Sequence, residues 1–168
     1  MASSRTRTQG NGHDRRRPDV AVLDDADKAL IEHLQRDGRT PYTRLAEAVG
    51  LSEAAVRQRV QRLIDNNVVQ IVAVTDPLRL GFRRQAMIGI RTEGDITTVA
   101  DSLAAMSEID YLVYTSGRFD LLAEMVCEDD EHLLNVLNEQ IRNIAGVSST
   151  ETFVYLRLQK QTYTWGSR

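Results

Sequence analysis

Two short amphipathic stretches joined by a glycine constrain this chain more than any other feature. In residues 52–64 apolar side chains recur at helical spacing, so one buried helix face is predicted, and Ser52 precedes it as a capping residue. A shorter stretch of the same kind ends at Gly50, which permits a sharp turn. The positions predicted to be buried are Leu45, Ala46 and Val49 in the shorter stretch, and Val56, Val60, Leu63 and Ile64 in the longer one.

One more helix is predicted before this pair, and its apolar side chains Leu30, Ile31 and Leu34 share a face. The first helix is predicted to begin at Asp24 or Asp25 and to end at Gly38. Thr40 followed by Pro41 is predicted to begin the second. Ser52 is predicted to begin the third, and Asn66 and Asn67 to end it. Three short helices with a tight turn before the last are typical of a helix-turn-helix domain that binds DNA.

The outward face of the third helix carries side chains suited to reading base edges. Gln58 and Arg62 are predicted opposite the buried face, and both types can form two hydrogen bonds to a base. Arg57 and Arg59 flank them, as phosphate contacts do. A solvated amphipathic helix with routine charges remains the alternative. The full set expected to contact DNA is Arg39, Thr40, Ser52, Ala54, Arg57, Gln58, Arg59, Gln61 and Arg62.

Charge is divided unevenly along the chain, whose formal net charge is −3. Residues 1–80 carry 13 Lys and Arg against 11 Asp and Glu, whereas residues 81–168 carry 8 against 13. This division favours a front half that faces a polyanion. Residues 1–18 hold five arginines and almost no apolar side chains, so a disordered arm is expected, either a solvated tail or a contact to the DNA backbone.

The second half predicts strands separated by helices. Residues 68–75 are expected to form a strand, followed by turns at Asp76–Pro77 and Gly81. The order after these turns is strand, helix, strand, strand, helix, strand, at residues 85–91, 96–103, 111–115, 119–127, 129–144 and 150–158. This βαββαβ order is that of ferredoxin-like domains. The fold class is therefore α+β, with a winged helix-turn-helix followed by a ferredoxin-like domain.

The predicted division is an arm at 1–18, a DNA-binding domain at 19–67, a strand linker at 68–81, a ferredoxin-like domain at 82–158 and a tail at 159–168. In a small domain of this type, two helices cover one sheet face. The other face, carrying Phe153, Tyr155 and Val126, requires a partner, which predicts a homo-oligomer.

Several functional classes find no support in the residues. No window approaches the ~18 consecutive apolar residues of a membrane span, and the N-terminus lacks a secretory signal, so a cytoplasmic protein with no membrane partner is expected. Cys127 is the single cysteine and has no ligand partners for zinc. The run from Asp129 to His132 suits the positive end of a helix better than a metal. No metal, cofactor or catalytic cluster is expected, so an enzyme is disfavoured.

The motifs taken together resemble the Lrp/AsnC, or feast/famine, family of prokaryotic transcription regulators. The resemblance spans about residues 23–158 and includes both halves in order. Asn67 departs from it, because the family usually has glycine there, and asparagine also adopts that conformation. The motifs that carry it are Leu23-Asp24, Leu34-Gln35-Arg36-Asp37-Gly38-Arg39, Leu45-Ala46, Val49-Gly50-Leu51-Ser52, Val56-Arg57-Gln58-Arg59-Val60, Asp76-Pro77, Leu80-Gly81, Gly117-Arg118-Phe119-Asp120 and Gly146-Val147 with Thr150 and Thr152.

The resemblance implies that the second half is an effector-sensing RAM or ACT-like domain. Such domains form dimers, tetramers or octamers, and small molecules, usually amino acids, bind between dimers near the Gly-x-x-Asp turn. Asp120 is expected to accept the ligand ammonium, with a local turn cap as the alternative. Arg118 favours an acidic or polar effector. The expected effector-binding set is Ser116, Gly117, Arg118, Phe119, Asp120, Thr150 and Thr152.

The predicted function is sequence-specific binding of double-stranded DNA by a transcription regulator. Its oligomeric state or DNA affinity is expected to respond to a small molecule, and the resemblance implies that this effector is an amino acid. The alternative is an architectural DNA-binding protein that senses nothing. Both share the same charge pattern, so the residues do not separate them.

Overall fold

The computed structural model describes residues 22–162 and divides them into two compact units, with the boundary between Val74 and Thr75. The predicted arm at 1–18 and the side chains of Tyr163 and Trp165 lie outside the described residues. None of the helices in residues 22–162 has the length and apolar character needed to cross a bilayer.

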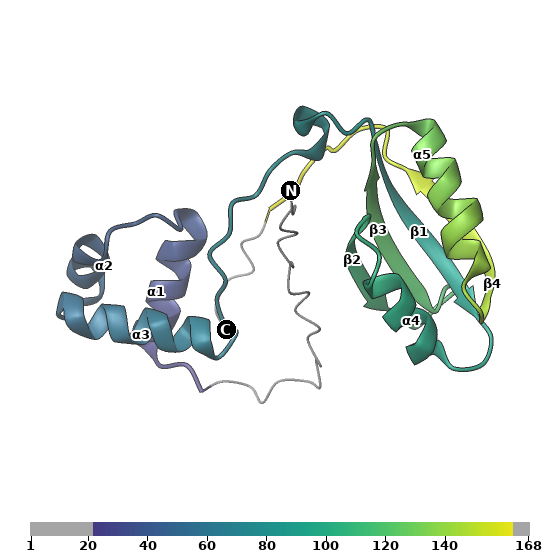
Figure 1. Cartoon of the computed structure of the whole chain (residues 1–168). Coiled ribbons are helices and arrows are strands. Elements are labelled where there is room, and N and C mark those ends of the chain that lie inside the picture. Colours follow the sequence, from purple (N-terminus) through teal and green to yellow (C-terminus); the bar gives the residue numbers. More distant parts are fainter. Residues whose placement is uncertain (1–21, 163–168) are drawn as a thin grey trace, which may run out of the picture. The chain divides into compact units, whose positions relative to one another are not determined.

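The first unit contains three short helices (Figure 1): α1 at Asp25–Arg36, α2 at Tyr42–Val49 and α3 at Glu53–Asp65. As predicted, the side chain of Asp24 caps α1 and that of Ser52 caps α3. The prediction for Thr40 is wrong. Pro41 is the N-cap of α2 and provides no side-chain cap, while the Thr40 hydroxyl donates to the Asp37 carbonyl 2.7 Å away. The turn before α2 satisfies that hydroxyl, so the helix begins without it.

Apolar side chains from all three helices form one core, as the spacing predicted. Gly50 takes a left-handed conformation with φ 68°, which turns the chain from α2 into α3. Asn67 does the same after α3 with φ 56°. Val49 and Ile64 are only partly buried. The buried members of this core are Leu30, Leu34, Leu45, Ala46, Val56 and Val60.

The strand predicted at residues 68–75 is wrong. Within residues 66–76 the chain has no strand, and therefore no wing follows α3. Ile71, Val72 and Val74 are 47%, 69% and 57% exposed. A strand requires hydrogen bonds from a neighbour, and the described part of the chain places none beside this segment. The turn that follows is as expected: a 3₁₀ turn, η1, spans Pro77–Leu80, and Gly81 has φ 103°.

The second unit contains a four-stranded antiparallel sheet in the order β2-β3-β1-β4. The strands are β1 at Arg84–Thr92, β2 at Ile109–Tyr114, β3 at Leu121–Cys127 and β4 at Val147–Val154. Helix α4 spans Ile96–Ala104, and α5 at Asp130–Asn135 continues as a π turn, η2 at Val136–Gln140, and a 3₁₀ turn, η3 at Ile141–Asn143. The predicted βαββαβ order and α+β class are confirmed.

The last strand is displaced from its predicted position at 150–158. It begins at Val147, directly after the left-handed Gly146, because Val147 already pairs with Thr92. It ends at Val154, because its partner β1 begins at Arg84 and the last bond joins the Tyr155 N–H to the Gln85 carbonyl. Leu156, beyond that point, is 96% exposed.

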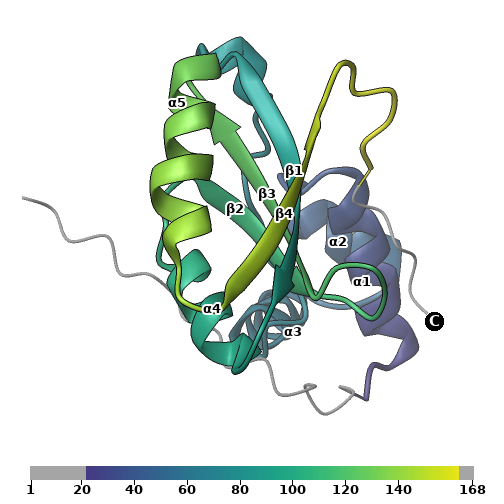
Figure 2. The same cartoon turned by 90° about the vertical axis from the view of Figure 1, so that its right-hand side faces the viewer.

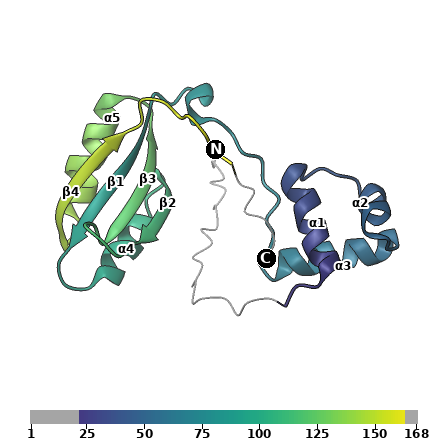
Figure 3. The ribbon, with the colours of Figure 1, turned by 180° about the vertical axis from the view of Figure 1, so that it is seen from behind.

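Helices α4 and α5 cover one face of the sheet, as Figures 1 and 2 show, and Figure 3 shows the strands from the uncovered side. The covered face holds the core of this unit, which includes Ile88, Ile90, Leu121, Met125, Leu103, Val136 and Ile141. The registers place one row across the uncovered face of the sheet: Tyr111, Glu124, Met87 and Phe153.

Candidate functional site

The exposed surface of α3 brings together most of the side chains predicted to contact DNA. Ser52, Ala54, Gln58 and Gln61 are exposed along this helix. The Gln61 amide donates to the Asp65 carboxylate at 2.8 Å, so part of its capacity is used within the helix. Gln58 has no such bond within residues 22–162 and presents its amide outward. Arg39 is also exposed, at the turn before α2, and Thr40 beside it is partly buried.

Arg57 is held on the α2 side of α3 by exposed Glu53 and partly buried Tyr42. Its guanidinium donates to Glu53 at 3.0 Å and lies 4.8 Å from the centre of the Tyr42 ring. Contacts of this kind between exposed groups are weak and exchange easily. A phosphate oxygen can therefore replace Glu53 as the partner of Arg57.

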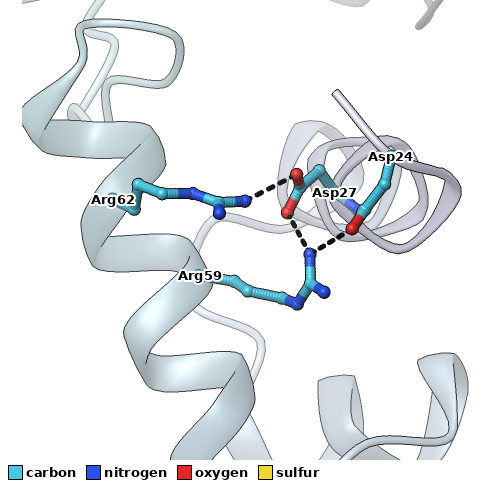
Figure 4. Close-up of polar contacts among 4 residues, drawn as sticks. All are labelled: Asp24, Asp27, Arg59 and Arg62. Carbon is cyan, nitrogen blue, oxygen red and sulfur yellow. Dashed lines mark hydrogen bonds and ion pairs between the residues drawn. The ribbon is translucent and has the colours of Figure 1, made fainter. Parts of the chain in front are cut away.

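Arg59 and Arg62 lie in a different environment, on the side of α3 that faces α1 (Figure 4). Arg59 donates to Asp24 at 2.7 Å and to Asp27 at 2.8 Å, and Arg62 donates to the other oxygen of Asp27 at 2.7 Å. Asp27 is 1% exposed and is the only buried charged side chain in residues 22–162. Arg62 was predicted to point away from the buried face, and the structure instead connects its guanidinium to a buried carboxylate.

The same bonds shift two ionisation equilibria. The backbone N–H of Asp27, and then the Arg59 guanidinium, lower the pKa of Asp24. The hydrogen bonds from Arg59 to Asp24 and Asp27 raise the pKa of the arginine. Sequence reasoning missed Asp27 as a partner. The available signal was its position three residues before Leu30, on the apolar face of the first helix, because a buried acid requires a cationic partner.

In the second unit, Asp120 anchors the turn between β2 and β3. Its Oδ2 accepts from the Thr92 N–H at 2.7 Å, and its own N–H donates to the Ile90 carbonyl at 2.9 Å. Its carbonyl accepts from the Thr115 N–H at 2.9 Å. These partners include the end of β1, so Asp120 does more than cap its own turn. One carboxylate oxygen is committed to holding the turn against the sheet.

Aromatic and charged side chains fix the rest of this turn on the uncovered face of the sheet. The Phe119 ring lies on Gly89, where an added Cβ would approach it to 2.6 Å, and meets Phe153 edge-on with centroids 6.1 Å apart. The Arg118 guanidinium lies 5.5 Å from the centre of the Phe119 ring and 3.1 Å from the Glu151 carboxylate. Ser116 and Gly117 are exposed beside them.

The structure does not bring Thr150 and Thr152 into this group. In the register of β1 with β4 they pair with Ile90 and Ile88, which face the helices. The Thr150 hydroxyl accepts a hydrogen bond from Arg142 at 3.0 Å. Glu151, between them, is the β4 residue that forms an ion pair with the turn, through Arg118. Sequence reasoning missed it because the strand register, which decides the face that each β4 residue occupies, was not known.

The acidic run at the start of α5 is accounted for by local bonds. The Asp129 carboxylate caps the helix by accepting from the His132 N–H at 2.9 Å, and Asp130 binds Arg84, with one bond of 2.7 Å. His132 lies 3.6 Å from Glu108. Among residues 22–162, no three His, Cys, Asp or Glu side chains converge as metal ligands would.

Comparison with known proteins agrees with both units. Residues 23–64 match the family model of an AsnC-type helix-turn-helix domain, and residues 82–168 match an AsnC-type C-terminal domain described as a dimeric alpha+beta barrel. The chain belongs to the Lrp/AsnC family of transcription regulators. Members of this family are named as regulators rather than enzymes.

Individual relatives of this Lrp/AsnC chain support the same assignment. The HTH-type transcriptional regulator FL11 of Pyrococcus furiosus is 34% identical over 84% of this chain and 94% of its own length. The structure of AsnC from E. coli superposes with a TM-score of 0.76 at 25% identity, over 84% of this chain and 97% of that one. The leucine response regulatory protein of Mycobacterium tuberculosis gives 0.75 at 27% identity, over 83% and 96%.

Proposed function

We propose that this Lrp/AsnC regulator binds specific sites in double-stranded DNA through α3, and that a small molecule, an amino acid, changes its assembly or its DNA affinity. The observation that carries the DNA-binding part is the outward face of α3, with Gln58 presented beside Arg57 after the tight turn at Gly50. Glutamine at that place suits a base edge, and arginine at its flank suits a phosphate.

Charge supports α3 and its surroundings as the DNA-facing part of the first unit. Residues 22–67 carry seven Lys and Arg against eight Asp and Glu, so the unit as a whole is not basic. Asp24 and Asp27, at the start of α1, are turned toward α3 and neutralise Arg59 and Arg62 there. Arg39, Arg44 and Arg57 are exposed in this unit and bind no buried carboxylate among the described residues, and we assign phosphate contacts to them.

The effector part of the proposal rests on the turn at residues 115–120. Ser116, Gly117 and Arg118 are exposed there, while Asp120 and Phe119 hold the turn in place. Exposed backbone N–H groups and an arginine suit a carboxylate, and Glu151 beside Arg118 suits an ammonium. A zwitterionic amino acid carries both groups. The name of the leucine response regulatory protein is consistent with this ligand class.

The uncovered face of the sheet supports a dimer as the smallest functional assembly, because Tyr111 and Phe153 are 51% and 44% exposed on it in the single chain. The matching family domain is described as dimeric. Two chains then present two α3 helices to DNA half-sites about one helical turn, or a multiple, apart. We propose that dimers assemble further, into tetramers or octamers, and that the effector shifts this equilibrium.

The test is light-scattering size exclusion of the full chain with each of the twenty amino acids in turn, followed by DNA binding with the same panel. A change in mass or DNA affinity with one or a few amino acids supports the effector role. An unchanged mass and affinity with all twenty overturns it and favours an architectural DNA-binding protein. Asp120→Ala is expected to abolish the response while DNA binding persists, because the turn loses its anchor on β1.

A further inference from the structure

The contact between α1 and α3 contains a charge arrangement that the DNA-binding role does not require by itself. Asp27 is 1% exposed, yet each of its carboxylate oxygens accepts a hydrogen bond from a different arginine of α3. The two arginines are three residues apart, so both lie on one side of the helix. Asp24, the N-cap of α1, receives the second bond of Arg59 and extends the contact to the helix end.

A buried carboxylate restricts the groups that surround it. Leaving Asp27 without a cation costs far more than breaking an exposed pair, because water cannot replace the lost bonds. Arg59 is 28% exposed and Arg62 is 54% exposed, so the arginines cover the carboxylate from the solvent side. The two bonds fix how α3 rotates and slides on α1. Apolar packing alone tolerates small displacements of this kind.

We propose that Asp27 is a positioning residue for DNA recognition: through Arg59 and Arg62 it sets the orientation of α3, and therefore where Gln58 and Arg57 meet the bases and phosphates. This inference rests on the proposed DNA-binding function of α3. It assigns Arg59 and Arg62 to the α1–α3 contact. Sequence-specific hydrogen bonds require side chains placed to within a fraction of an ångström, whereas non-specific phosphate binding does not.

Asp27→Asn is a clear test because the loss of helix orientation and the loss of negative charge change the affinity for the specific duplex in opposite directions. Removing a negative charge from a DNA-binding unit strengthens binding to any duplex by simple electrostatics. Loss of the anchor weakens binding to the specific site only. Asp25→Asn is the matched control: Asp25 lies two residues away in the same first turn, is exposed, and makes no side-chain hydrogen bond among the described residues.

The probes are a duplex selected by the unmodified full chain from a random-sequence library, and a scrambled duplex of the same composition. Asp27→Asn is expected to lose about tenfold or more in affinity for the selected duplex, the size of one good base contact, and to keep or gain affinity for the scrambled one. Asp25→Asn is expected to change both affinities alike. If Asp27→Asn follows Asp25→Asn on both duplexes, the positioning role is overturned.

Thermal unfolding shows whether Asp27→Asn folds. If it does not, a second variant tests the proposal. Arg62→Gln leaves Arg59 on Asp27, and its effect on the selected duplex is measured across a salt series. A positioning residue lowers the affinity with an unchanged slope of log K against log salt, whereas a direct phosphate contact reduces that slope by about one. A reduced slope overturns the proposal. If the unmodified chain selects no duplex, sequence-specific binding itself fails, which is a separate result.

Discussion

The arginines of α3 differ in what holds them, and that difference determines which are available to DNA. Arg57 pairs with exposed Glu53, and an exposed pair contributes only about 0–1 kcal/mol. Arg59 and Arg62 share a buried carboxylate, whose loss of both partners is costly. We therefore propose the exposed amide of Gln58, with Arg57 beside it, as the centre of the recognition surface.

Gln58→Ala is expected to weaken binding to a selected duplex by about 1–3 kcal/mol relative to a scrambled one, because a paired amide contact to a base is lost. Fluorescence anisotropy with both duplexes measures the difference. Gln35→Ala, on α1, removes the same amide and is expected to leave the ratio unchanged. An equal loss on both duplexes with Gln58→Ala would exclude Gln58 as a base-reading residue.

Asp24 provides a prediction for acid conditions. Its pKa is below the ordinary 3.8, because the Asp27 N–H and then Arg59 stabilise the carboxylate. A carboxyl with a lowered folded pKa contributes stability that is present above pH 3.8 and is lost as the pH falls through the folded pKa. Asp24→Asn is expected to lower the thermal midpoint of the helical unit near neutrality, by a margin that shrinks below pH 3.8. A margin independent of pH would contradict this linkage.

Some residue roles were predictable and others were not, for identifiable reasons. The caps of Asp24 and Ser52 depend on local spacing, and both are confirmed. A helical wheel gives the direction in which the Cα–Cβ bond of Arg62 points, but its long side chain reaches back to Asp27 of α1. Asp27 lies 35 positions earlier in the chain, so no local sequence pattern includes it. The role of Asp120 as an anchor for β1 was missed for the same reason, because Thr92 lies 28 positions earlier in the chain.

At the level of elements, the turn between β2 and β3 depends on Gly89 of β1, which has no side chain. A Cβ on Gly89 would lie 2.6 Å from the Phe119 ring, so Gly89→Ala forces the ring and its turn away from the sheet. Overpacking of this kind costs about 1–3 kcal/mol, which thermal unfolding measures. Phe119→Leu in the same chain is expected to recover part of the loss. If the two effects simply add, the ring and Gly89 do not interact in solution.

Strands were harder to place than helices because their ends depend on partners. The order of elements in the second unit followed from alternation and turn residues, and it is confirmed. The position of β4 followed from β1, whose start at Arg84 leaves Leu156 and Leu158 unpaired. The segment at 68–75 has the composition of a strand, yet no described neighbour pairs with it. Amino-acid composition indicates that a segment favours an extended backbone, but a strand forms only where a neighbouring backbone supplies hydrogen bonds.

For the whole molecule, we propose that the uncovered sheet face connects assembly to DNA binding. Its central row contains Tyr111, Met87 and Phe153, with Glu124 among them. A single chain leaves these apolar side chains in water, and a two-fold partner would cover them with the same surface. Two α3 helices joined in this way would bind two half-sites together, which would raise the effective affinity by orders of magnitude over one helix.

Substitutions of two tyrosines of β2 distinguish an effect on assembly from an effect on the stability of the fold. Tyr111 is 51% exposed on the uncovered face, and Tyr114, on the same strand, is 54% exposed on the opposite face. Tyr111→Arg places a cation beside Glu124, its cross-strand neighbour, so the single domain gains a favourable pair while the interface receives a buried charge. Light scattering is expected to show monomers for Tyr111→Arg and at least dimers for Tyr114→Arg.

The monomer is expected to keep its affinity for a single half-site and to lose its preference for paired half-sites. If Tyr111→Arg remains a dimer with the paired-site preference intact, the chains associate through another surface, and the uncovered face of the sheet does not couple the two α3 helices.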